Sequence, residues 1–282
     1  MSLGLEAQQR ILHSYLFVPG NRPERFAKAW ATEADAVIVD LEDAVPPQER
    51  ALARSALDAW LSPSRPVLVR INGAGTEWFP DDVACCAKAG VSGIVLPKTE
   101  RVEDILLVGD HTAADISILP LIETAQGFWN ALPLARTPRV QRLVFGPLDL
   151  QLDLGMDAEE DELLHFRSTL VLASRLAGLQ PPVDGVTTAI DDPDRLRTDT
   201  LRSKRLGFGA KLCIHPKQVS IVNACFAPTA EEEAWARRVM KAATASSGAA
   251  VTLDGRMVDR PIVARAQAIL ASIKQQRRMP TK

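Results

Sequence analysis

The stretch Ala36-Val-Ile-Val-Asp-Leu-Glu42 decides the fold prediction, because a short apolar run leads directly into acidic residues. Eight apolar runs of this kind start 21 to 40 residues apart, at Tyr15–Pro19, Ala36–Glu42, Pro66–Asn72, Gly93–Lys98, Ile116–Glu123, Arg142–Leu150, Pro182–Val186 and Ala210–His215. Continuous Val, Ile and Leu runs indicate strands buried on both faces, and the spacing leaves room for a helix after each strand. The sequence therefore predicts an α/β protein with a (β/α)8 TIM barrel, whose chemistry lies where the strands end.

Helical patterns fill the intervals between the predicted strands. They cover residues 23–33, 47–61, 80–90, 100–104, 124–134, 159–177, 191–206 and 216–225. The pattern changes after Phe226: a capped helix is expected at Thr229–Ala245, a short strand at Val251–Asp254 and a last helix at Pro261–Lys274. We therefore predict a barrel domain at residues 1–226 and a C-terminal helical extension at residues 227–282, acting as an arm or lid that contacts a neighbouring subunit.

Composition limits the partners of this 282-residue chain. Its 35 acidic and 33 basic residues give a net charge of −2, which does not favour nucleic acid or an anionic membrane as the main partner. The four cysteines form no C-x-x-C pair, and no apolar run approaches the roughly 18 residues of a membrane span. Met1–Arg10 also lacks the apolar segment of a secretory leader. We expect a cytoplasmic protein with reduced cysteines.

Two carboxylates close predicted strands five and six and are candidate metal ligands. Glu123 ends Ile116–Glu123, and Asp149 lies in the last part of Arg142–Leu150. Two acids that converge at a barrel mouth can hold a hard divalent cation such as Mg²⁺, which keeps several waters and leaves room for substrate oxygens. The alternative is that each carboxylate caps the following helix or pairs with a base.

Arg70 ends predicted strand three, where an unpaired charge would be costly to bury. Its forked donors suit a two-point grip on a small carboxylate such as a keto acid. Alternatively, Arg70 forms a structural ion pair with Asp40 or Glu42, which share one face at the end of predicted strand two. The same acids could supply a base or orient water on a metal, and the pattern does not choose among these roles.

Two further segments carry basic or polar groups. Phe17–Arg25, followed by Lys28, combines a glycine turn, a helix start and bases, a combination that can cradle an anion. His215 closes predicted strand eight, where it could act as a base or have a structural role. No Rossmann or P-loop glycine motif occurs, so a nucleotide site of either kind is unsupported.

Seven short motifs together resemble the citrate lyase β-subunit family, which includes malyl-CoA and citramalyl-CoA lyases within the HpcH/HpaI aldolase superfamily. The motifs are Phe17-Val-Pro-Gly-Asn, Asp40-Leu-Glu-Asp-Ala-Val45, Val69-Arg-Ile-Asn72, Leu96-Pro-Lys-Thr-Glu100, Leu121-Ile-Glu-Thr-Ala-Gln-Gly127, Phe145-Gly-Pro-Leu-Asp-Leu150 and Ile214-His-Pro-Lys-Gln218. The similarity extends through Gly255-Arg-Met-Val-Asp-Arg-Pro261 and thus spans nearly the whole chain.

The resemblance implies an Mg²⁺-dependent carbon–carbon lyase that cleaves, or forms by Claisen-type condensation, a 3-hydroxyacyl-CoA thioester such as citramalyl-CoA or malyl-CoA. It assigns Glu123 and Asp149 to the metal, Glu123 also to substrate binding, and Arg70 to the keto acid as a binding and catalytic residue. Asp259 matches a catalytic acid on an arm that reaches a neighbouring subunit, as in homotrimers or hexamers. The positions that line the acyl-thioester site are Phe17, Lys28, Pro97, Lys98, Ile214 and His215.

Two departures and two alternatives accompany this resemblance. The chain is shorter than some malyl-CoA lyases, and Glu24 stands where some relatives carry Lys. One alternative function is the β subunit of a citrate lyase complex that depends on an acyl carrier protein. The other is a metal-dependent aldolase of free hydroxy-keto acids, which needs no thioester.

Overall fold

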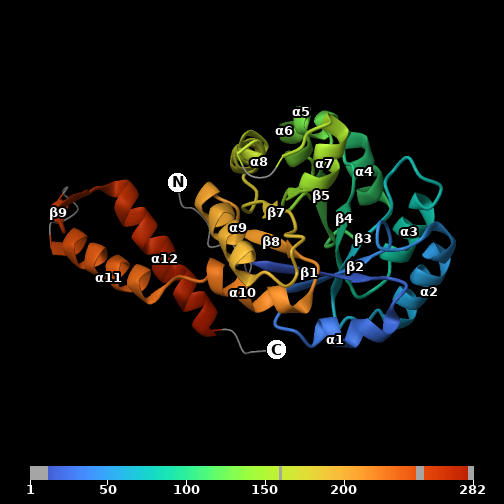
Figure 1. Ribbon diagram of the computed structural model, residues 1–282, viewed down its shortest axis with the longest axis horizontal. Coiled ribbons are helices and arrows are strands. Elements are labelled where there is room, and N and C mark those ends of the chain that lie inside the picture. Colours follow the sequence, from blue (N-terminus) through green and yellow to red (C-terminus); the bar gives the residue numbers. More distant parts are fainter. Residues whose placement is uncertain (1–11, 159–160, 246–250, 279–282) are drawn as a thin grey trace. The chain divides into compact units, whose positions relative to one another are not determined.

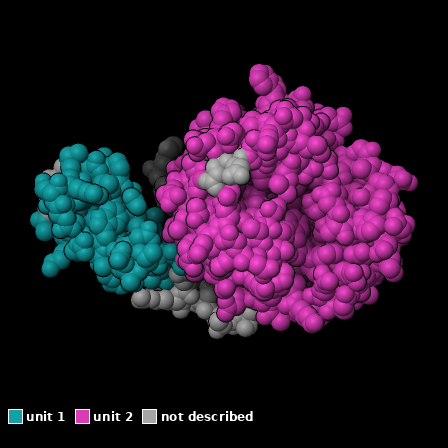
Figure 2. All heavy atoms as spheres, in the orientation of Figure 1, with its two compact units in different colours: residues 1–10, 227–282 teal, residues 11–226 magenta. Residues whose placement is uncertain are grey.

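The computed structural model describes residues 12–158, 161–245 and 251–278, and it divides the chain into two compact units. Figure 2 colours the units separately: residues 11–226 form one, and residues 227–282 belong to the other. Two predictions fall partly or wholly outside the described residues. They are the expected absence of a leader in Met1–Arg10 and the first two residues of the helix expected at 159–177. Within the part that is described, no helix has the length and apolar character needed to cross a bilayer.

The larger unit confirms the predicted eight-stranded barrel (Figure 1). All neighbouring strands pair in parallel, and β1 closes the barrel by pairing with β8 as well as with β2. The strands are β1 (Ser14–Pro19), β2 (Ala36–Asp40), β3 (Val67–Arg70), β4 (Val91–Leu96), β5 (Ser117–Ile122), β6 (Val144–Phe145), β7 (Val183–Asp184) and β8 (Ala210–Cys213).

Helices surround the barrel, and several begin at a proline whose fixed φ suits the first helical turn. Two short 3-10 helices, η1 (Pro23–Arg25) and η2 (Pro47–Glu49), precede α1 (Phe26–Trp30) and α2 (Arg50–Trp60). The others are α3 (Phe79–Cys86), α4 (Val102–Asp110), α5 (Ala125–Trp129), α6 (Ala131–Ala135), α7 (Pro147–Leu154), α8 (Leu164–Leu176), α9 (Pro193–Leu206) and α10 (Pro216–Phe226).

The strands bury both faces, as their continuous apolar sequences predicted. In β2, Ile38 packs with residues contributed by the other strands, whereas Val37 and Val39 pack in the larger cluster that includes helix residues. Because successive side chains of a strand point to opposite faces, the first cluster fills the barrel interior and the second lies beneath the helices. All four cysteines are free and buried.

The prediction of a long sixth strand reaching Leu150 was wrong. Strand β6 ends at Phe145, and Pro147 begins α7 after the turn at Gly146. Asp149 therefore lies in the first turn of α7 rather than at a strand end. The sequence Pro-Leu-Asp-Leu reads as an apolar run, but its proline starts a helix that exposes Leu148 and Leu152.

A buried ion cluster joins the last two strands to the helices around them. Asp184 of β7 is 0% exposed, and its Oδ1 accepts a hydrogen bond from Arg167 Nε of α8 at 3.2 Å. Its Oδ2 lies 3.8 Å from Lys211 Nζ of β8 and accepts a hydrogen bond from the Ser203 hydroxyl. Burial alone would raise the pKa of Asp184, but Lys211, Arg167 and Ser203 outweigh burial and hold it below its ordinary value.

The smaller unit has a core of its own. Helix α11 (Ala230–Ala245) and helix α12 (Arg260–Arg278) flank an antiparallel hairpin of β9 (Val251–Leu253) and β10 (Arg256–Val258). The predicted cap is present, since Thr229 Oγ1 accepts a hydrogen bond from Glu232 N and Glu232 Oε2 accepts one from Thr229 N. The buried side chains of this core come from α11, β10 and α12: Ala236, Val239, Val258 and Ala266.

Replacing Asp184 tests the buried cluster. We expect Asp184→Asn to lower the free energy of unfolding at pH 7 by about 3 to 5 kcal/mol, because Arg167 and Lys211 would lose their buried counter-ion. Asp191→Asn is the control, since Asp191 is exposed and forms a surface ion pair with exposed Lys217. Chemical denaturation of both variants measures the effect, and equal losses would show that the cluster does not stabilise the barrel.

Candidate active site

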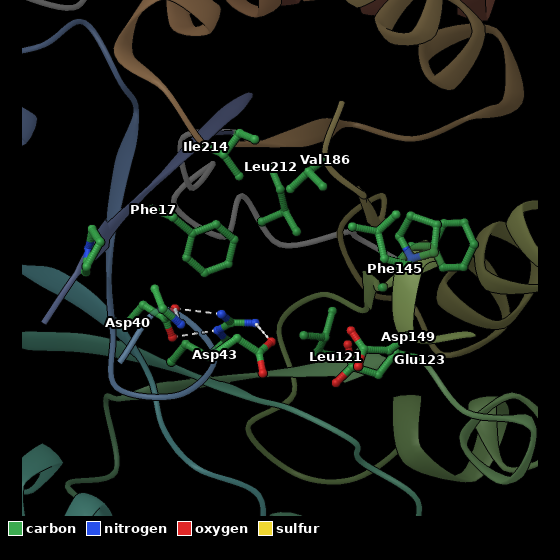
Figure 3. Close-up of a pocket in the computed structure, with 16 residues that line it drawn as sticks. Phe17, Asp40, Asp43, Leu121, Glu123, Phe145, Asp149, Val186, Leu212 and Ile214 are labelled. Carbon is green, nitrogen blue, oxygen red and sulfur yellow. Dashed lines mark hydrogen bonds and ion pairs between the residues drawn. The ribbon is translucent and has the colours of Figure 1, made fainter. Parts of the chain in front are cut away.

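The carboxyl ends of the strands surround a cavity of about 380 Å³, where the predicted acids and Arg70 meet. Figure 3 shows Asp40 and Asp43 at one end of this cavity and Glu123 with Asp149 at the other, with Leu121 between them. These residues come from the ends of β2 and β5 and from the start of α7, while Arg70 is the last residue of β3. The cavity thus brings together Arg70, Glu123 and Asp149, three of the polar residues that the sequence analysis singled out.

Arg70 is fixed by a two-point ion pair with Asp40 on the adjacent strand. Arg70 Nε donates to Asp40 Oδ1 at 2.7 Å, and Nη2 donates to Asp40 Oδ2 at 2.6 Å. The third nitrogen, Nη1, donates to Asp43 Oδ2 at 3.1 Å and lies 3.2 Å from Glu42 Oε2. Burial would lower the pKa of Arg70, but these acids raise it above its ordinary value, so the guanidinium stays charged.

Glu123 directly follows β5 and is only 3% exposed. Its Oε1 accepts a hydrogen bond from the backbone N of Lys98 at 2.8 Å. Burial, together with the charges of Asp149 and Glu42, raises the pKa of Glu123 to about 8. A carboxylate in such surroundings is stabilised in its ionised form by a nearby cation.

Gly146 makes the position of Glu123 possible. A Cβ atom built on Gly146 would lie 2.5 Å from Glu123 Cβ and would overlap the Glu123 carboxylate as well. Any larger residue between β6 and α7 would therefore push Glu123 out of its present place. The sequence contained this glycine, but the close approach of two segments distant in sequence was not readable from it.

Lys98 connects the two ends of the polar site. Its Nζ donates to Glu42 Oε1 at 3.0 Å and lies 3.8 Å from Asp149 Oδ1, while its backbone N binds Glu123. Its φ of 48° lies in the left-handed region that glycine favours. Burial would lower the pKa of Lys98, but the hydrogen bond to Glu42 and the surrounding acids raise it. Lys98 is therefore a charged partner of both candidate metal ligands.

Glu123 and Asp149, which lie side by side in Figure 3, stay the candidate ligands of a hard divalent cation. Asp149 is 36% exposed at its side chain, so the pair has one buried and one accessible carboxylate. Among the described residues, no group of three or more His, Cys, Asp and Glu side chains surrounds a single point. A pair of carboxylates is compatible with Mg²⁺, which takes few protein ligands and retains water or substrate oxygens.

The other predicted substrate residues divide into two groups. Phe17 and Ile214 line the cavity, and the Phe17 ring centroid lies 4.8 Å from Arg70 Cζ. The residues Lys28, Pro97, Lys98 and His215 do not line it. His215 instead turns toward its own loop, because its Nδ1 accepts a hydrogen bond from Lys217 N at 3.2 Å and its backbone N donates to Gln218 Oε1.

Asp259 belongs to the smaller unit, at the start of α12. Its Oδ1 accepts a hydrogen bond from the backbone N of Ile262 at 3.3 Å, which caps the helix. The catalytic assignment of Asp259 stays a prediction.

Sequence reasoning missed the apolar wall of the cavity. Its side chains come from strands β5, β6 and β8, from the segment after β7 and from the start of α7: Leu121, Phe145, Leu148, Val186 and Leu212. Inward alternation at strand ends was the available signal, because Leu121 and Leu212 share the interior cluster with Ile38.

The raised pKa of Glu123 gives a pH-dependent stability in protein stripped of divalent cations. The folded state favours the protonated carboxyl, so the free energy of unfolding, relative to Glu123→Gln, should fall as pH rises from about 4 to about 8. The decline should reach up to about 1.4 kcal/mol per pH unit. Asp149→Asn should shift the window to lower pH, because one of the acids that raise this pKa is removed. Parallel denaturation profiles for wild type and Glu123→Gln would contradict the assignment.

Known proteins are similar in sequence to this chain over most of its length. Residues 13–216 match the model of the HpcH/HpaI aldolase/citrate lyase family. The chain is 35% identical to a citrate lyase subunit beta-like protein of Deinococcus radiodurans, covering 95% of this chain and 99% of the relative. It is also 35% identical to a (3S)-malyl-CoA thioesterase of Cereibacter sphaeroides, covering 94% and 98%.

A solved structure extends the similarity to the fold. The crystal structure of CitE from Mycobacterium tuberculosis in complex with magnesium, acetoacetate and coenzyme A superimposes with a TM-score of 0.85 at 34% identity. The alignment covers 94% of this chain and all of the other. The resemblance inferred from the motifs is confirmed, and the chain belongs to the HpcH/HpaI aldolase/citrate lyase family, whose members are lyases or CoA-related enzymes.

Proposed function

We propose that the protein is an Mg²⁺-dependent carbon–carbon lyase acting on a 3-hydroxyacyl-CoA thioester such as citramalyl-CoA or malyl-CoA. The products would be a keto acid and an acyl-CoA, and the reverse reaction would be a Claisen-type condensation. The observation that carries the proposal is the placement of Arg70 across one cavity from Glu123 and Asp149. This arrangement offers a guanidinium for a carboxylate and a metal site for the oxygens beside it.

Glu123 and Asp149 would hold the magnesium ion. When bound there, Mg²⁺ supplies Lewis-acid polarisation of the substrate oxygens. The M. tuberculosis relatives contain magnesium together with acetoacetate and coenzyme A, or with oxaloacetate, which supports the same ion here.

Arg70 would bind the carboxylate of the hydroxy acid and later that of the keto acid. Asp40 prevents the guanidinium from turning, because it occupies Nε and Nη2 and itself accepts hydrogen bonds from the backbone N atoms of Glu42 and Ala44. A fixed positive charge beside the reacting oxygens stabilises negative charge without reorganisation during the reaction.

Cleavage also removes the hydroxyl proton and adds a proton to the thioester α-carbon, and we assign the protonation of that carbon to Asp259 of a neighbouring subunit. The C-terminal unit would then act as an arm within a homotrimer or hexamer. Phe17, Lys28, Pro97, Lys98, Ile214 and His215 would contact the acyl-thioester portion of the substrate. Phe17 and Ile214 line the cavity, which supports their part of the assignment.

Turnover of purified protein with Mg²⁺ and citramalyl-CoA or malyl-CoA tests the proposal. We expect release of pyruvate or glyoxylate together with acetyl-CoA. Glu123→Ala and Asp149→Ala should abolish this release, because each removes one of the two metal ligands. Asp191→Ala, at an exposed ion pair, should retain it. Unchanged activity in both site variants would contradict the metal assignment.

The same assay separates the competing functions. The relative named (3S)-malyl-CoA thioesterase makes thioester hydrolysis a second candidate, which would yield free CoA and an intact hydroxy acid. Cleavage only of a substrate attached to an acyl carrier protein would identify a citrate lyase β subunit. Cleavage of free hydroxy-keto acids without any thioester would identify an aldolase.

Gly146→Ala tests the metal site without changing a charged residue. Because the added Cβ would collide with Glu123, we expect Mg²⁺ affinity to fall by about 10- to 100-fold, as for other groups that orient metal ligands. Gly75→Ala is the matched control, since a Cβ at Gly75 meets no atom within 4 Å. Titration calorimetry with Mg²⁺ measures both variants, and equal affinities would show that Gly146 does not position a metal ligand.

A further inference from the structure

The cavity between Arg70 and the two candidate metal ligands is charged at its ends and aliphatic along its wall. Of the described residues that line it, Arg70 alone is basic, and four are acidic: Asp40, Asp43, Glu123 and Asp149. The remaining lining residues are all apolar, namely Phe17, Pro19, Ala44, Leu121, Phe145, Gly146, Pro147, Leu148, Val186, Leu212 and Ile214. Among these described side chains, Arg70 therefore offers the cavity its one hydrogen-bond donor.

Arg70 has capacity for a single carboxylate. Asp40 already occupies Nε and Nη2, at 2.7 and 2.6 Å, and both of its oxygens are held by backbone amides as well. The accessible partner is Asp43, whose side chain is 54% exposed and contacts Nη1 at 3.1 Å. A substrate carboxylate can displace Asp43 from Nη1, but a second carboxylate would find the guanidinium fully engaged.

Lys98 does not provide the missing second charge. Its ammonium donates to Glu42 at 3.0 Å and lies 3.8 Å from Asp149, so both acids already compensate its charge. The wall side chains Leu121, Val186 and Leu212 are all apolar (Figure 3). An ionised group placed against this wall would lose its water without gaining a partner.

We propose that the keto acid released by this enzyme has one carboxylate and a small aliphatic substituent, as in pyruvate or 2-oxobutyrate, and that dicarboxylic keto acids such as oxaloacetate are rejected. This inference rests on the function proposed above and narrows its substrate class. The aliphatic wall buries an alkyl group favourably and penalises a terminal carboxylate. The corresponding thioesters are of the citramalyl type rather than the citryl type.

Binding of keto acids in the presence of Mg²⁺ tests the proposal independently of turnover. Freshly dissolved oxaloacetate and 4-methyl-2-oxopentanoate have nearly the same size and differ in the charge of the terminal group. By titration calorimetry, pyruvate, 2-oxobutyrate and 4-methyl-2-oxopentanoate should each bind about tenfold or more tightly than oxaloacetate. Equal or tighter binding of oxaloacetate would overturn the specificity inference and leave the lyase function standing. Failure of every keto acid to bind would instead count against the proposed function itself.

A charge added to the wall should reverse the preference. We expect Val186→Lys to raise oxaloacetate affinity relative to that of pyruvate by about tenfold, because the terminal carboxylate would gain a cation in a partly desolvated site. Ile190→Lys is the matched control: it adds the same charge four residues later at a side chain that is outside the cavity lining and 39% exposed. An unchanged affinity ratio in Val186→Lys, or an equal shift in Ile190→Lys, would contradict a specificity role for the wall.

Discussion

The ion pair between Asp40 and Arg70 fixes the geometry on which the rest of the site depends. The two side chains are 2% and 12% exposed, and they lie opposite each other in the register of β2 and β3. Asp40 is held twice, by the guanidinium and by the backbone N atoms of Glu42 and Ala44, so neither partner can rotate alone. Removing either one would leave a buried charge without its partner, which explains why a binding residue can also stabilise the barrel. Nη1 is then the one guanidinium nitrogen that Asp40 does not bind, and it contacts Asp43 and Glu42.

Acidic side chains outnumber basic ones around this ion pair, so neighbouring groups must compensate the repulsion between the acids. Burial together with Asp149 and Glu42 raises the pKa of Glu123, whereas the positive charge of Lys98 lowers it. The backbone of Lys98 is in the left-handed region. A non-glycine residue at such a φ is tolerated only where its surroundings fix it, and strain of this kind gathers at functional sites. Here the backbone N of Lys98 binds Glu123 while its ammonium binds Glu42. The strained residue thereby holds acids from two different strand ends together.

Strand periodicity predicted the barrel and the residues at its mouth, because buried parallel strands leave a continuous apolar signal along the chain. For Arg70, the two interpretations drawn from the sequence are compatible, since the side chain pairs with Asp40 and also lines the cavity. Asp149 was identified as a site residue but placed on the wrong element, because Pro147 turns an apolar run into a helix. The ion cluster of Asp184 and the fit of Gly146 against Glu123 depend on contacts between distant segments, and no local pattern encodes them.

The polar ends of the cavity are stabilised by hydrogen bonds, whereas part of its aliphatic wall is exposed. Substitutions can therefore alter that part of the wall without disturbing the polar ends. Asp40 and Glu123 are buried, and the side chain of Arg70 is 12% exposed. Hydrogen bonds to the backbone or to each other fix all three, which makes their replacement costly to the fold. In the wall, Leu121, Phe145 and Leu212 are buried as well, but Leu148 is 52% exposed and lies outside the strands. Substituting exposed side chains on the segments that follow the strands rarely costs much stability. One barrel can therefore keep its charge geometry while the shape and polarity of its wall determine which acid it accepts.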